Sequence, residues 1–288
     1  MISAGSPFWL FAVALGASAL GGTLGMASGI FIVPLLTAFG HADIRTAIGA
    51  SLVSVIACSC GGASSSLRGQ LTNVRLAIVL ETATTLGALT GVLLAGAIAT
   101  SYLFGLFAVV LLISAQQMYS RRGDRRGPSR LARKPQRWEA ALRLDSRDPE
   151  RARQGVTYQV ERLPLGLLLM YGAGVISALL GIGSGVLKIP AMDTALRLPM
   201  KVSSATSNFM IGVTAAASAG AYFLRGHIVT TVAGPVALGS VVGAVIGARA
   251  LMTVSNDRVR LLFVVVLAGL AIQMFLAAFG LTVLGGAA

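Results

Sequence analysis

The chain has 288 residues, of which 55% are hydrophobic and only 11% are charged, and its formal net charge is +13. An ordinary soluble domain carries about a quarter charged residues, so this composition excludes a soluble globular protein. We therefore expect an all-α, polytopic integral membrane protein.

The apolar segments are long enough to form membrane-spanning helices, each of which needs about 20 residues. They lack the alternation of polar and apolar residues typical of a β-barrel, so helices must satisfy their backbone in lipid. In chain order we expect eight spans, at residues 8–38, 46–66, 74–98, 102–119, 163–191, 201–224, 228–249 and 259–283.

Residues 120–162 form the one hydrophilic block and hold 13 of the 23 basic residues. The positive-inside rule predicts that this arginine-rich loop is cytoplasmic. With four spans on either side of it, both termini are expected to be cytoplasmic as well. Arg249, Arg258 and Arg260 conflict with this topology, because they surround a connection expected outside. Either the interface tolerates them, or one glycine-broken segment does not fully cross.

The basic loop has no recognisable nucleic-acid-binding fold, and its arginines are explained by membrane orientation and by attraction to anionic lipid. We expect no nucleic-acid partner. A short helix around Trp138 could rest on the membrane surface, and a solvated linker is the equally simple alternative.

The chain repeats itself with a constant shift of 156 residues. Aligning Gly25 with Gly181 also aligns Pro34 with Pro190 and Ser51 with Ser207. The repeats predict three parts: residues 1–119, the loop 120–162, and residues 163–288. Duplicated halves are typical of secondary transporters, whose site lies between the repeats near the bilayer midplane. Because four spans separate equivalent points, we expect parallel repeats; an odd number would make them inverted.

Both copies contain a glycine- and proline-rich segment, GMASGIFIVP at 25–34 and GIGSGVLKIP at 181–190. Glycine and proline both disfavour a continuous helix, so we expect a broken helix in each half. Amides freed at the start of a half-helix carry partial positive charge and can bind an anion. The candidate ligands here are Gly25, Ser28, Gly29, Gly181, Gly183, Ser184 and Gly185.

Lys188 is an ionisable residue within an expected span, where it costs a few kcal/mol and usually faces a cavity, a partner or a substrate. It is a candidate for anion binding. The alternative is that it snorkels to the interface and pairs with Asp193. Its counterpart in the first half is Ile32, so the halves are not chemically equivalent.

A second group of candidates begins the next helix of each half: Ser51 in the first, and Thr206, Ser207 and Asn208 in the second. These side chains can bind a ligand by hydrogen bonds. Small and hydroxylated residues also pack membrane helices against each other. For Ser51 alone packing is favoured; for Ser207 and Asn208 a site is slightly favoured.

Glu81 is the acidic residue that lies well inside an expected span. A membrane carboxylate is a common element of proton relays, so Glu81 is a candidate for proton coupling. Alternatively it pairs with Arg75 or Arg68.

Other motifs indicate packing rather than chemistry. Gly87 and Gly91, repeated as Gly243 and Gly247, form GxxxG motifs that let two helices approach closely. No cluster has metal-ligand spacing, and Cys58 and Cys60 point to different faces of a helix. We expect no enzyme activity, no metal and no cofactor.

The two glycine-rich segments, each followed by a helix that opens with AIGASL or SSATSN, resemble the TauE/SafE (TSUP) family of sulfite and organosulfonate transporters from about residue 8 to 280. The resemblance implies a transporter of the bacterial cytoplasmic membrane and points to Gly25, Ser28, Gly29, Pro34, Ser51, Gly181, Gly183, Ser184, Gly185, Pro190 and Ser207. Ala27 replaces the glycine common in the family, which favours the second half as the ligand site.

The repeats and broken helices predict a secondary transporter of a small anion, and the resemblance implies that it exports an anion such as sulfite or an organosulfonate. The residues leave direction and coupling ion open, and we expect proton coupling. The alternatives are an anion channel and a membrane scaffold or assembly subunit. The expected partners are the anionic substrate and the lipid bilayer; a homo-oligomer stays open.

Overall fold

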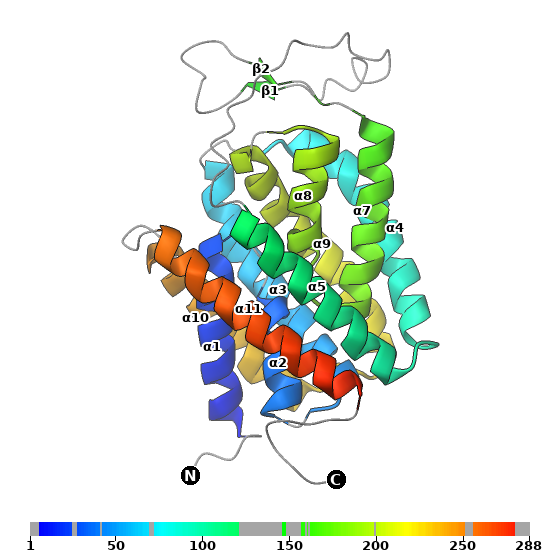
Figure 1. The fold of residues 1–288 in the computed structure, drawn as a ribbon, viewed down its shortest axis with the longest axis vertical. Coiled ribbons are helices and arrows are strands. Elements are labelled where there is room, and N and C mark those ends of the chain that lie inside the picture. The colour runs from blue at the N-terminus through cyan, green and yellow to red at the C-terminus, as the bar shows by residue number, and fades with distance from the viewer. Residues whose placement is uncertain are drawn as a thin grey trace.

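The computed structural model describes residues 6–24, 28–40, 42–68, 72–120, 146–147, 157–158, 160, 162–198, 200–250 and 256–279. These residues form ten helices and one pair of two-residue strands (Figure 1). The elements are α1 (Pro7–Leu24), α2 (Gly29–Ala38), α3 (Ile44–Arg68), α4 (Val74–Ala95), α5 (Thr100–Ser120), β1 (Ser146–Arg147), β2 (Thr157–Tyr158), α7 (Leu163–Leu180), α8 (Gly185–Ala195), α9 (Met200–Leu224), α10 (Thr230–Ala250) and α11 (Asn256–Ala278).

Every expected span corresponds to a helix, and both expected interruptions are present. The segment 8–38 is divided into α1 and α2, and the segment 163–191 into α7 and α8. Pro34 and Pro190 lie inside the short helices α2 and α8. The prediction of an all-helical membrane protein with two broken helices is confirmed.

Each interruption folds the chain back on itself. Gly40, just after α2, is so close to Trp9 near the start of α1 that a methyl group on Gly40 would lie 3.2 Å from the indole ring. Gly166 near the start of α7 is closer still to Leu196 after α8, whose Cδ2 would lie 2.5 Å from a methyl group on Gly166. Both α1–α2 and α7–α8 are therefore hairpins that begin and end at the same end of the molecule.

The two halves are inverted relative to each other. Gly87 and Gly91 of α4 pack on the backbones of Tyr171 and Val175 of α7, so these two helices run parallel. Since the α1–α2 hairpin returns to the end where α3 begins, α1 points the same way as α3. Helix α4 runs opposite to α3, so α7 runs opposite to α1 (Figure 1). The expectation of parallel repeats is wrong, because each half crosses three times and adds a hairpin.

The GxxxG prediction is confirmed with the same geometry in both halves. Gly243 and Gly247 of α10 pack on the backbones of Leu15 and Ala19 of α1. This contact is the repeat equivalent of the α4–α7 contact. Each hairpin therefore packs against a helix of the opposite repeat: α1 against α10, and α7 against α4.

This topology also corrects the expected location of the termini. The starts of α1 and α3 lie at the end of the molecule opposite the end of α5, the start of α7 and the strands β1 and β2, and so does the end of α11 (Figure 1). The expectation that the loop and both termini share one side is wrong. Helix α10 runs toward the loop's side, so the connection flanked by Arg249, Arg258 and Arg260 lies on that side. The conflict with the positive-inside rule is thereby removed.

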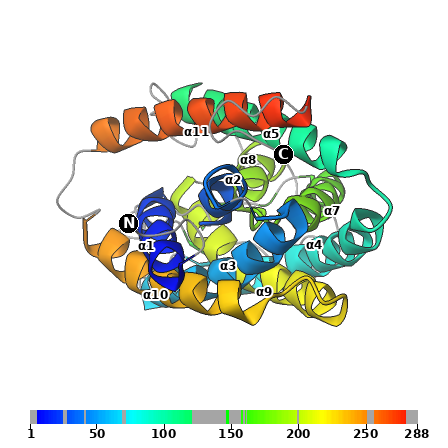
Figure 2. The ribbon, with the colours of Figure 1, turned by 90° about the horizontal axis from the view of Figure 1, so that it is seen from below.

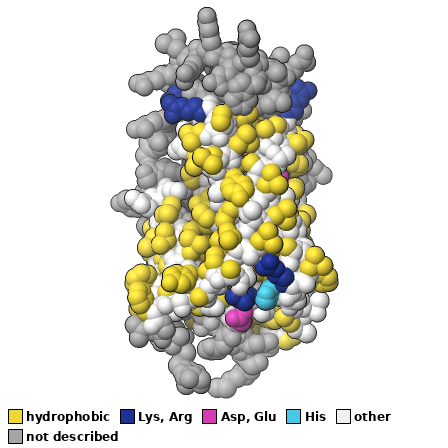
Figure 3. Space-filling model, turned by 90° about the vertical axis from the view of Figure 1, so that its right-hand side faces the viewer, with side chains coloured by type: hydrophobic (Ala, Val, Ile, Leu, Met, Phe, Trp, Pro, Cys, Tyr) yellow, Lys and Arg dark blue, Asp and Glu magenta, His cyan; other side chains and the backbone are white. Residues whose placement is uncertain are grey.

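The half-helices lie in the centre of the bundle. Viewed from below, α5 and α11 form one outer layer, α3, α9 and α10 form the opposite one, and α2 and α8 lie between them (Figure 2). Helices α4, α5, α7 and α10 are long and apolar enough to span a membrane. Hydrophobic side chains cover the outer face (Figure 3), and Leu238 of α10 is 65% exposed. Such a surface is stable in contact with lipid.

Candidate anion site

The interruptions of the two halves meet in the interior. Gly29, the first residue of α2, lies directly against the carbonyl oxygen of Gly181, at which α7 ends. Gly181 has a φ of +66°, a conformation that glycine adopts at little cost. A side chain at Gly29 would collide with this carbonyl and with the hydroxyl of Ser51, 2.6 Å away. The absence of side chains thus lets the two backbones touch.

At the interruption of the first half, the buried hydroxyls of Ser28 and Ser51 are bonded, whereas Ser18 of α1 has no hydrogen-bond partner among the described residues. Ser51 donates a 2.7 Å hydrogen bond to the carbonyl oxygen of Gly181. Ser28, which precedes α2, is 2.7 Å from the hydroxyl of Ser54, and Ser54 bonds in turn to Ser240 of α10. Ser240 donates to the carbonyl oxygen of Val236. Each hydroxyl in this series of hydrogen bonds therefore has an acceptor for its proton.

The second half differs. Ser184, which precedes α8, and Ser207 of α9 are both fully buried, and within the described part of the chain neither hydroxyl has a hydrogen-bond partner. Ser184 makes no capping bond to α8 and has a φ of +38°. Ser207 lies against Gly185, with its hydroxyl 3.6 Å from where a Cβ of Gly185 would be. Buried polar groups normally find partners, so two free hydroxyls at one helix start are notable.

This end of α8 is suited to binding an anion. The amide of Gly185 bonds to the carbonyl of Gly183, and those of Leu187 and Lys188 bond to the carbonyl of Ser184. The start of α8 nevertheless carries the positive end of the helix dipole. Two serine hydroxyls beside it can donate hydrogen bonds. Gly183 and Gly185 carry no side chains, but Cδ1 of Ile211 lies 2.5 Å from where a Cβ of Gly185 would be, so an oxyanion must displace Ile211 to reach this part of the backbone.

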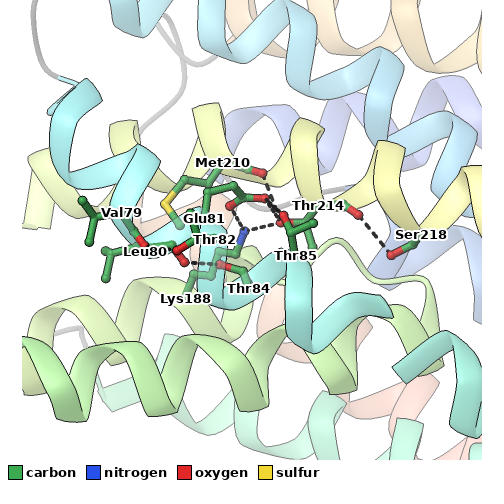
Figure 4. Close-up of polar contacts among 10 residues, drawn as sticks. All are labelled: Val79, Leu80, Glu81, Thr82, Thr84, Thr85, Lys188, Met210, Thr214 and Ser218. Carbon is green, nitrogen blue, oxygen red and sulfur yellow. Dashed lines mark hydrogen bonds and ion pairs between the residues drawn. The ribbon is translucent and has the colours of Figure 1, made fainter. Parts of the chain in front are cut away.

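Lys188, one turn along α8, is fully buried and forms an ion pair with Glu81 of α4 (Figure 4). Its Nζ lies 3.0 Å from Oε2 of Glu81 and 2.6 Å from Oγ1 of Thr214 in α9. Snorkelling and pairing with Asp193 are therefore wrong for Lys188, and Glu81 pairs with Lys188 rather than with Arg75. The side chain of Arg68 lies outside the described part of the chain. The inverted fold brings α4 beside α8 and α9, and this arrangement creates the pair.

Two threonines complete the environment of Glu81. Thr214 donates a 2.5 Å hydrogen bond to Oε1, and Thr85, one turn along α4, donates to the same oxygen over 3.3 Å. Sequence reasoning missed Thr214. Its spacing in the sequence could have identified it. Thr214 follows Ser207 by seven residues and precedes Ser218 by four, so the three side chains share one face of α9.

Comparison with known proteins agrees with this architecture. The family model described as "Sulfite exporter TauE/SafE" matches residues 10–274, nearly the whole chain. The chain belongs to this family. It is also 22% identical over 229 residues to a protein named "Probable membrane transporter protein YunE" from Bacillus subtilis (strain 168), covering 76% of this chain and 79% of the relative. No solved structure matches. The protein is thus a multi-pass membrane transporter of the TauE/SafE family.

Some of the predicted site residues lie where the two interruptions meet, and others do not. Thr206 accepts a 3.3 Å hydrogen bond from the amide of Asn73, at the loop-side end of the bundle, away from the interruption. Asn208 is half-buried on a different side of α9 from Ser207. Gly25 and the expected surface helix around Trp138 lie outside the described residues. Ser28, Gly29, Ser51, Gly181, Ser184, Gly185 and Ser207 are brought together where the interruptions meet.

Among the described residues, no group of three His, Cys, Asp or Glu side chains could hold a metal ion. Cys58 and Cys60 are both free cysteines. The polar chemistry of this region therefore comes from hydroxyls, backbone amides and one ion pair.

Proposed function

We propose that the protein exports a small sulfur-containing anion, such as sulfite or an organosulfonate, across the bacterial cytoplasmic membrane. The substrate would bind at the start of α8, between the two repeats. The observation that carries this proposal is the pair of buried hydroxyls without partners, Ser184 and Ser207, beside the first amides of a half-helix. The family description, which names sulfite, supports the substrate class.

The inverted repeats support a carrier mechanism. Transporters with inverted repeats place their site at broken helices near the midplane and alternate access by moving one repeat against the other. Here the two interruptions touch through Gly29 and Gly181, so relative motion of the halves would open and close the region between them. Because the serine hydroxyls at the interruption of the first half are already hydrogen-bonded, we favour the second half as the place where the anion binds.

We further propose that the arginine-rich loop is cytoplasmic. Of the ten basic residues outside this loop, only Arg45 and Arg225 belong to the opposite end of the bundle, and Lys188 is buried. This distribution satisfies the positive-inside rule. With the loop in the cytoplasm, the start of α1 and the end of α11 would lie outside it. Proton coupling is assigned to Glu81, the carboxylate buried within the bundle.

The test is flux in proteoliposomes that contain the purified full-length protein. We expect saturable counterflow of labelled sulfite or sulfoacetate. Ohmic current without saturation would indicate an anion channel instead, and no flux of any anion would indicate a scaffold. Ser184→Leu should block flux, because a large apolar side chain would replace a buried hydroxyl at the start of α8. The matched control is Thr82→Leu, on an exposed position of α4, which should leave flux unchanged. Normal flux in Ser184→Leu would overturn the proposed site.

A further inference from the structure

The buried lysine lies within one helical turn of the proposed anion site. Ser184 immediately precedes α8 and Lys188 follows it by four residues. The backbone amide of Lys188 bonds to the carbonyl of Ser184 over 2.8 Å. The one buried cation among the described residues is therefore one turn along the chain from Ser184, and Ser207 lies against Gly185 in that turn.

Glu81 is held in the way that a bound oxyanion would be held. One carboxylate oxygen accepts a hydrogen bond from the ammonium group of Lys188, and the other accepts bonds from the hydroxyls of Thr214 and Thr85 (Figure 4). A carboxylate and a sulfonate present similar acceptor oxygens with delocalised negative charge. A buried ammonium group needs one anionic partner, and its separation from that partner is costly unless another anion replaces it.

Resting on the proposed function, we infer that the Glu81 carboxylate and the transported anion compete for Lys188. Ionised Glu81 occupies the lysine and weakens anion binding. When Glu81 takes up a proton, it no longer balances the charge of Lys188, and the anion replaces it. Proton binding and anion binding therefore favour each other.

The described residues contain one such buried ion pair. The repeat counterparts of Lys188, Glu81 and Thr214 are Ile32, Ala237 and Cys58, none of which supplies a comparable charge. No other charged side chain contacts Glu81 in the described part of the chain: α7, which packs on α4, has no Asp, Glu, Lys, Arg or His, and α9 presents Thr214. The linkage should therefore involve one proton per anion.

The direction of this linkage between proton binding and anion binding determines how pH affects transport. As pH falls, more Glu81 is protonated, Lys188 is released and anion affinity rises, by at most about tenfold per pH unit for one proton. A monovalent anion would then move together with one proton, without net charge. An interior more alkaline than the bath should drive its accumulation in proteoliposomes. Net export from a cell would require an outward anion gradient larger than the opposing proton gradient.

The experiment measures the affinity of the detergent-purified full-length protein for ethanesulfonate between mildly acidic and mildly alkaline pH. This probe keeps one negative charge throughout, whereas sulfite titrates near neutrality and would itself produce a pH dependence. For the native protein we expect affinity to rise toward acidic pH, approaching about tenfold per pH unit. Glu81→Gln should bind more tightly at alkaline pH and show no pH dependence, and Thr82→Val should behave as the native protein does.

The double variant Glu81→Gln with Lys188→Gln removes both charges. It leaves no unpaired buried charge, so it serves as a second test where a single variant fails to fold. It should lose most of the affinity at every pH. Native binding without pH dependence, or the same pH dependence in Glu81→Gln, would overturn the competition and leave the proposed function standing. Undiminished binding by the double variant would also overturn it. Absence of binding and of flux for every sulfur anion tested on the native protein would overturn the proposed function itself.

Discussion

Ser51 of the first half donates a 2.7 Å hydrogen bond to the carbonyl oxygen of Gly181, at the interruption of the second half. A helix that breaks inside a membrane leaves backbone groups that protein must satisfy. Here the opposite repeat supplies the partner. Ser207, the repeat counterpart of Ser51, has no such partner among the described residues. The two equivalent serines are thus distinguished by their surroundings, and they should respond differently to substitution.

Ser207→Ala should weaken anion binding with little loss of protein stability. Its hydroxyl has no partner to lose within the described residues, but a hydrogen bond to an anion is worth about 1.5–3 kcal/mol, or roughly tenfold to a hundredfold in affinity. Ser54→Ala is the matched control, because Ser54 bonds to Ser28 and Ser240. It should lower the melting temperature and keep the affinity. Both quantities can be read from thermal unfolding with and without sulfoacetate; equal loss of affinity in the two variants would contradict the assignment.

Gly87→Ala should destabilise the protein, and Gly172→Ala should not. Both glycines lie inside helices, so the change in helix propensity is similar. A methyl group on Gly87 meets the backbone of Tyr171, whereas nothing lies within 4 Å of one on Gly172. We expect a loss of about 1–3 kcal/mol for the first variant and a neutral effect or a gain of up to about 1 kcal/mol for the second. Unfolding in detergent measures both; equal stabilities would show that the α4–α7 contact tolerates separation.

The ion pair should show strong coupling in a double-mutant cycle. Lys188→Met leaves Glu81 buried without its cation, which typically costs about 3–5 kcal/mol. Adding Glu81→Leu removes the stranded charge, so the double variant should regain most of the lost stability. The measurement is the free energy of unfolding of the four proteins. Additive effects would indicate that the two side chains do not interact.

Much of the architecture can be read from the sequence because it depends on local composition. Length and hydrophobicity predict the spans, and glycine with proline predicts the interruptions, since these residues act on their own backbone. The repeat of Gly87 and Gly91 as Gly243 and Gly247 likewise predicts two close helix contacts of the same kind.

The fold-back of the hairpins could not be read in this way. A glycine-rich break is compatible with a helix that continues and with one that turns back, and the choice depends on packing against the other repeat. Arg249, Arg258 and Arg260 were the signal, because they suit the inverted topology alone. The pair between Glu81 and Lys188 was missed for the same reason. Its members are 107 residues apart, and hydrophobic patterns do not specify which buried charges meet.

The inverted topology predicts that the start of α1 and the arginine-rich loop face opposite sides of the membrane. Single cysteines at Ser6, just before α1, and at Ser146, in β1 of the loop, test this directly. Cys58 and Cys60 are first replaced by serine, because both are free and Cys60 is exposed. In intact spheroplasts a membrane-impermeant maleimide should label Ser6→Cys and not Ser146→Cys, and in inside-out vesicles the pattern should reverse. Labelling of both positions from one side would require each half to cross an even number of times. That result would rule out the hairpins on which the meeting of Gly29 with Gly181 depends.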